Sequence, residues 1–130
     1  MRGTGLSDFY WAFDVANDTA FQRLAEAVQA LREAKLSGDW RDGNYWKQVF
    51  RGANVAWGVD FLVERFKVGE FVLVGLRRND FGTTELQDIG IEPLECGYLE
   101  FEPFACPYSG DCMGQLIEAF GHRNISSFGA

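Results

Sequence analysis

The chain has 130 residues, of which 47% are hydrophobic and 24% charged, and its formal net charge is −7. This composition predicts one folded domain over residues 1–130 and excludes a disordered chain. The negative charge disfavours nucleic acid and anionic membranes as partners, and charged residues interrupt every apolar stretch before it reaches membrane-spanning length.

The first half of the chain predicts one strand followed by helices. Residues 8–15 alternate in side-chain character as a strand does, with aromatic or aliphatic residues at every second position. Asp18 is the expected N-cap of the next helix, and residues 37–38, Ser-Gly, are its expected end. Apolar residues at helical spacing then predict a short helix within 44–50 and a longer one over 55–66.

The second half predicts a three-stranded meander and a last helix. The strands are expected at 70–78, 83–89 and 97–103, with the tetrapeptide NDFG turning the chain between the first two. Helical spacing of apolar residues predicts a helix over about 110–120. Residues 123–130 lack periodicity, so we expect this tail to fray.

These elements predict an α+β fold. We expect a mostly antiparallel sheet of about four strands, formed by the N-terminal strand and the C-terminal meander, with two or three helices between them and one C-terminal helix. One face of the sheet should be solvated, because Leu99 and Phe101 point inward while Glu100 and Glu102 alternate with them and point outward.

Residues 106–122, CPYSGDCMGQLIEAFGH, hold two of the three cysteines and the single histidine. Cys112 and His122 would lie roughly 15 Å apart along a helix, which is too far for a nucleophile and its base. Cys112 could still be reactive, because a helix N-terminus lowers a thiol pKa. Zinc sites usually present two ligands two to four residues apart, and Cys96, Cys106, Cys112 and His122 contain no such pair. We therefore expect no metal and no cofactor.

Catalytic and export motifs that the sequence lacks also bear on the class of protein. No couple of carboxylates stands out as an acid and base pair, which favours a protein without catalytic activity. No export signal is recognisable and the number of cysteines is odd, so we expect reduced thiols in the cytoplasm. The alternative is a small-molecule or metal-binding domain centred on the loop from Cys106 to Cys112.

Acidic residues dominate positions 79–122, where Lys and Arg are absent. The acids there are Asp80, Glu85, Asp88, Glu92, Glu95, Glu100, Glu102, Asp111 and Glu118. Such a field attracts basic proteins, although it is also what a solubilising surface needs. The residues expected to bind a basic protein partner are Glu92, Glu95, Tyr98, Glu100, Glu102, Tyr108 and Asp111. Small acidic immunity or inhibitor proteins that cover basic bacterial toxins share this profile, and we take that class as the working hypothesis.

Overall fold

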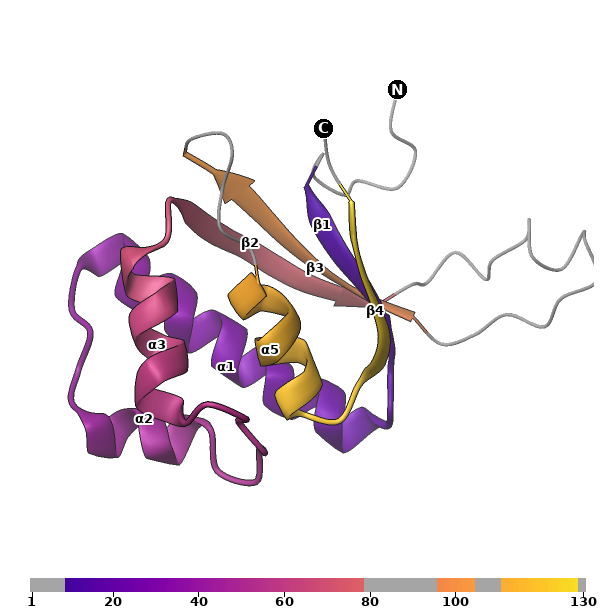
Figure 1. The fold of residues 1–130 in the computed structure, drawn as a ribbon, viewed down its shortest axis with the longest axis horizontal. Helices are drawn as coiled ribbons and strands as arrows, with labels where there is room; N and C mark the ends of the chain where they lie inside the picture. The colour runs from indigo at the N-terminus through magenta and orange to yellow at the C-terminus, as the bar shows by residue number, and fades with distance from the viewer. Residues whose placement is uncertain (1–8, 79–95, 105–110, 129–130) are drawn as a thin grey trace, which may run out of the picture.

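A computed structural model of the chain describes residues 9–78, 96–104 and 111–128. These residues form a four-stranded sheet, and the described helices gather on one of its faces (Figure 1). The elements in chain order are β1 (Tyr10–Asp14), α1 (Asp18–Ser37), α2 (Gly43–Val49), α3 (Val59–Val68), β2 (Phe71–Arg78), β3 (Cys96–Pro103), α5 (Asp111–Ala119) and β4 (Arg123–Phe128). The α+β class with an antiparallel sheet is thus confirmed.

The strand order of the sheet is β2-β3-β1-β4, and every neighbouring pair is antiparallel. The N-terminal strand β1 lies in the interior, where Ala12 is opposite Tyr98 of β3 and Ser126 of β4. Strand β2 forms one edge, and its register against β3 shifts between Leu73 and Gly75. The strand expected at 83–89 lies outside the described residues.

The segment expected to fray forms the edge strand β4 instead. Its side chains are mostly exposed, and Ile125 is the residue of β4 that packs against the core. The strand is held by its backbone pairing with β1 and by the ring of Phe128, which stacks on Tyr10 with centroids 4.9 Å apart. An edge strand with polar faces has no apolar alternation, so the pattern that identifies strands is absent from its sequence.

The ends of α1 are fixed by residues with specific capping roles. Asn17, and not the expected Asp18, is the N-cap: its side-chain oxygen accepts a hydrogen bond of 2.8 Å from the backbone N–H of Ala20. At the other end Gly38 has a φ of 78°, a left-handed conformation that glycine adopts without strain. The expected stop at residues 37–38 is therefore confirmed.

Helix α3 begins at Val59, later than the expected start at residue 55. The preceding Gly58 has a φ of 91°, which lies outside the helical range, so the helix cannot extend back through it. Of the residues expected on the buried face of this helix, Leu62, Val63 and Phe66 are buried. Val55 and Val59 are half-buried, and Ala56, which precedes the helix, is exposed. None of the described helices is long and apolar enough to cross a bilayer.

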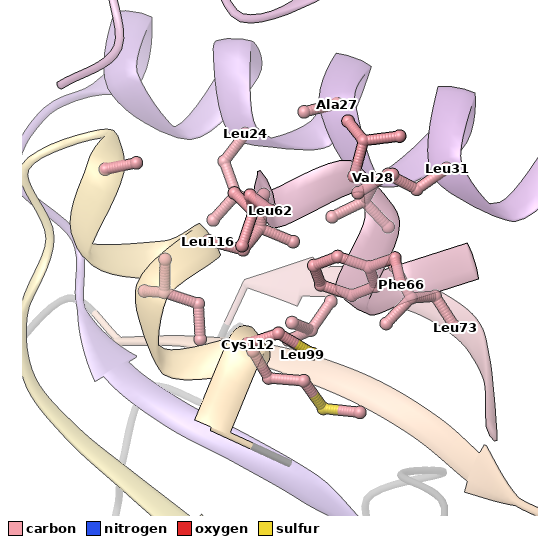
Figure 2. Close-up of a cluster of buried hydrophobic side chains, with 14 of the residues drawn as sticks. Leu24, Ala27, Val28, Leu31, Leu62, Phe66, Leu73, Leu99, Cys112 and Leu116 are labelled. Carbon is pink, nitrogen blue, oxygen red and sulfur yellow. The ribbon is translucent and has the colours of Figure 1, made fainter. Parts of the chain in front are cut away.

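The core lies between the helices and the sheet. Figure 2 shows Leu24 and Leu31 of α1, Leu62 of α3, Leu99 of β3 and Leu116 of α5 in one cluster, and each of them is at most 2% exposed. Residues far apart in sequence therefore share one interior, as expected for a single hydrophobic core over the described residues.

Candidate functional sites

The residues expected to bind a partner do not come together on one described surface. Tyr98, Glu100 and Glu102 alternate along β3 on the face that points away from the helices, whereas Asp111 starts α5, which covers the opposite face (Figure 1). Three more of the expected residues lie outside the described residues: Glu92, Glu95 and Tyr108.

Glu100 does not project into solvent, which corrects the sequence prediction. The residue is 4% exposed, and its carboxylate forms an ion pair with Nε of Arg77 at 2.6 Å. The alternation correctly placed Glu100 on the face opposite Leu99, but it did not show that β3 is an interior strand with β2 and β1 on either side. A carboxylate in this position is partly neutralised and contributes little to a docking surface.

Asp111 is also paired with a base from the first part of the chain. Its carboxylate lies 3.1 Å from Nη2 of Arg65 on α3, and both side chains remain accessible to solvent. Together with the pair between Arg77 and Glu100, this contact brings compensating positive charge to a segment that has none in its own sequence. Among the described acids of 79–122, Glu102, Asp111 and Glu118 are exposed, and Asp111 is the one of these three that is paired with Arg65.

Tyr98 belongs to a cluster of rings on the face of the sheet away from the helices. Its ring meets Tyr10 edge-on at a centroid distance of 5.6 Å, and Tyr10 in turn stacks on Phe128 of β4. Burial raises the pKa of the Tyr98 hydroxyl above its usual value. The tyrosine therefore packs against β1, and its hydroxyl stays protonated at neutral pH.

Cys112 and His122 are buried, and neither is prepared for catalysis. Burial raises the pKa of the Cys112 thiol to about 12, which contradicts the expectation of a lowered value at a helix N-terminus. His122 is 2% exposed, and its Nδ1 accepts a hydrogen bond of 3.0 Å from the N–H of Ala16. Among the described residues no three His, Cys, Asp or Glu side chains gather as a metal ion would require, and Cys106 lies outside them.

We expect Cys112 to resist alkylation in the folded protein. Only the thiolate reacts, and a buried thiol with a pKa of about 12 is almost fully protonated at neutral pH. The measurement is the rate of iodoacetamide modification, followed by mass spectrometry in a variant with Cys96→Ser and Cys106→Ser. Modification should become rapid in guanidinium chloride. Equal rates in folded and unfolded protein would show that the thiol is accessible.

We expect His122 to titrate below its ordinary pKa of 6.5, because burial of the imidazole lowers its pKa. Below pH 6.5 the unfolded chain binds a proton that the folded protein excludes. The contribution of His122 to stability is therefore lost as the pH falls from 6.5 towards the lower folded pKa. The single histidine can be followed by NMR, and a midpoint at or above 6.5 would contradict its burial.

An exposed aromatic surface on α3 was missed by the sequence analysis. Trp57, just before the helix, is 54% exposed and Phe61 is 48% exposed, and their rings meet edge-on with centroids 5.5 Å apart. Asp60 and Glu64 on the same helix are exposed, and Val68, two turns beyond Phe61, is 65% exposed. We call these five residues the α3 surface. The sequence does contain a sign of this surface, because Trp57 and Phe61 do not share the helical spacing that places Leu62 and Phe66 on the buried face.

Comparison of the chain with protein-family models, with curated proteins and with solved structures finds no match. Functional inference for this chain therefore depends on the chemistry of its own residues.

Proposed function

We propose that this chain is a non-catalytic binding protein that docks a basic protein partner. The observation that carries the proposal is the α3 surface, where two large aromatic side chains are about half exposed beside two carboxylates. Apolar side chains that remain exposed together are typical of interaction sites. Aromatic residues are also the side chains most often found at the energetic centre of protein interfaces.

The chemistry of the α3 surface fits a partner that presents lysine or arginine. Asp60 and Glu64 can pair with cationic side chains, and the faces of Trp57 and Phe61 can accept them in cation–π contacts. No described residue forms an ion pair with Asp60 or Glu64, so both carboxylates are available. The net charge of −7 adds long-range attraction to the same class of partner.

The finer form of the proposal is an immunity- or inhibitor-type protein that covers a basic site on its partner in the cytoplasm. The exposed carboxylates of Glu102 and Glu118 support it by adding to the attractive field. The free thiols of Cys96 and Cys112 are in keeping with a reducing compartment.

The alternative of a metal or small-molecule site around Cys106–Cys112 gains no support from the described residues. A cysteine binds a metal ion as its thiolate, and the buried Cys112 thiol has a pKa of about 12. Its side chain belongs to the hydrophobic core instead of facing a cavity (Figure 2).

The proposal is tested by mapping a captured partner onto the α3 surface. The partner is isolated from the extract of the source cells on immobilised protein, and binding is then measured with a Trp57→Ala variant and with a double variant, Asp60→Lys and Glu64→Lys. The controls are Leu36→Ala, which removes another exposed apolar side chain, and Glu102→Lys with Glu118→Lys, which changes the charge equally elsewhere.

We expect the α3 variants to weaken binding by about tenfold or more, since a central aromatic residue contributes about 1–2 kcal/mol or more at an interface. Association should also slow as salt is raised, because exposed charges are screened within about 10 Å at 0.1 M ionic strength. An acidic partner, or a basic partner whose binding ignores both α3 variants, would contradict the proposal. Loss of binding with the Glu102 and Glu118 variant alone would place the docking site on the C-terminal half.

A further inference from the structure

A pocket of about 340 Å³ opens beside the first turns of α1, next to the segment that follows α2 and to the residue after α5. Its volume is about ten times the roughly 30 Å³ that a water molecule occupies in the liquid, so it can hold a small organic ligand. The lining residues are Thr19, Ala20, Arg23, Arg51, Gly52 and Phe120. The charged residues of this lining are the two arginines. Arg23 lies on α1, and Arg51 lies in the segment that follows α2.

Hydrogen bonds to backbone carbonyls hold both guanidinium groups at the pocket. Nη2 of Arg23 donates to the carbonyl oxygen of Arg51, and Nη1 of Arg51 donates to the carbonyl of Gln48 at 2.9 Å. Gly52 lies close to the first of these groups, since a Cβ built on it would be 3.7 Å from Nη2 of Arg23. Both arginine side chains are therefore anchored to the backbone at the end of α2 and just beyond it before any ligand arrives.

No carboxylate of the described chain neutralises either of these arginines. Asp18, five residues before Arg23 on α1, is paired with Arg78 at 2.7 Å instead. Glu26, one turn after Arg23, lines the neighbouring groove between α1 and α2 and forms no ion pair. In a protein with a net charge of −7, this pocket is a local site of positive charge.

The Nε atom of Arg23 is buried and has no hydrogen-bond partner. A buried donor without an acceptor is costly, and a charged one more so, which makes such atoms informative in a folded protein. The carbonyls at the end of α2 account for one N–H of each arginine, as expected for cations beside the negative end of a helix. Nε of Arg23 is closed to solvent, as are the Nε atoms of Arg32 and Arg78, so a ligand in the pocket would be bound through the Nη groups.

We propose that this pocket binds an oxyanion, and specifically the phosphate group of a small phosphate monoester. Phosphate oxygens accept paired hydrogen bonds from arginine forks, and a doubly charged group matches two arginines. The Nη groups of the two arginines can donate to the phosphate oxygens, and the hydroxyl of Thr19 can donate as well. Phe120 and Ala20 provide an apolar wall for the organic part of the ligand.

The test uses phenyl phosphate, inorganic phosphate and benzoate as probes at constant ionic strength. We expect saturable NMR shifts of the backbone amides of Thr19 and Gly52 with phenyl phosphate, weaker ones with inorganic phosphate, and none with benzoate at the same concentration. Arg51→Gln should weaken phenyl phosphate binding by about tenfold or more, since hydrogen bonds between charged partners are stronger than those between neutral ones. Arg51 is exposed, so this variant should fold normally.

Two further variants separate site binding from a general charge effect. Lys47→Gln removes the same charge from the exposed side of α2 and should bind phenyl phosphate as the wild type does. Arg23→Lys keeps the charge but loses the planar fork and should weaken binding. Shifts that do not saturate, or that persist in the Arg51→Gln and Arg23→Lys variants, would overturn the proposal. Equal binding of benzoate would identify the ligand class as carboxylates and overturn the assignment to phosphate.

Discussion

Replacing Leu116 by alanine is expected to lower the free energy of unfolding by about 2–5 kcal/mol. Leu116 is 0% exposed on α5, and Figure 2 shows it in the cluster with Leu24, Leu62 and Leu99. The loss combines the transfer free energy of the removed atoms with the cavity that remains between α5, the other helices and the sheet. This is a large share of the roughly 5–15 kcal/mol that stabilises a typical domain.

The control for Leu116→Ala is Glu118→Ala on the same helix, because Glu118 is exposed. It should change the free energy of unfolding by no more than about 0.5 kcal/mol. Both variants can be compared with the wild type by guanidinium chloride unfolding. The comparison requires that the slope of the free energy of unfolding against denaturant concentration is unchanged. If Leu116→Ala also costs less than about 0.5 kcal/mol, this face of α5 does not form the core as described.

Elements with an amphipathic pattern could be predicted from the sequence, because burial imposes the pattern. The spacing of Leu116 and Ile117 identifies α5, and the alternation of Leu99 and Phe101 identifies β3. Strand β4 has no such signature, since its stability comes from pairing with β1, and that pairing is a property of the folded chain. The sequence therefore allowed us to predict on which face of a helix or strand a residue lies. It did not allow us to predict an edge strand with polar side chains.

The candidate docking site was harder to predict because charge pairing depends on tertiary contacts. Residues 79–122 contain no Lys or Arg, yet Arg65 and Arg77 reach Asp111 and Glu100 from elements that precede this segment in sequence. A linear charge count cannot anticipate such pairs. For the same reason the sequence could not show that Arg23 and Arg51 share one pocket.

Replacing Gly97 by alanine is the second change expected to lower the stability strongly. Gly97 is buried on β3 directly opposite Phe13 of β1. A Cβ built on Gly97 would lie 2.5 Å from Cζ of Phe13, closer than any real contact. The Phe13 ring has little room to move, because it packs against His122 with centroids 4.9 Å apart and is 2% exposed. Gly97→Ala should therefore lower the free energy of unfolding by about 1–3 kcal/mol, as overpacking of a core does.

Two further variants show whether the cost at Gly97 comes from the contact with Phe13. Gly75→Ala on β2 adds the same methyl group where nothing lies within 4 Å, so it should have little effect on the free energy of unfolding. Phe13→Leu shortens the opposing side chain and should make Gly97→Ala less costly in the double variant, with a coupling of about 0.5–3 kcal/mol. If the two changes are additive in chemical denaturation, the clash with Phe13 is not what requires glycine at this position, because residues that compete for one space cannot act independently.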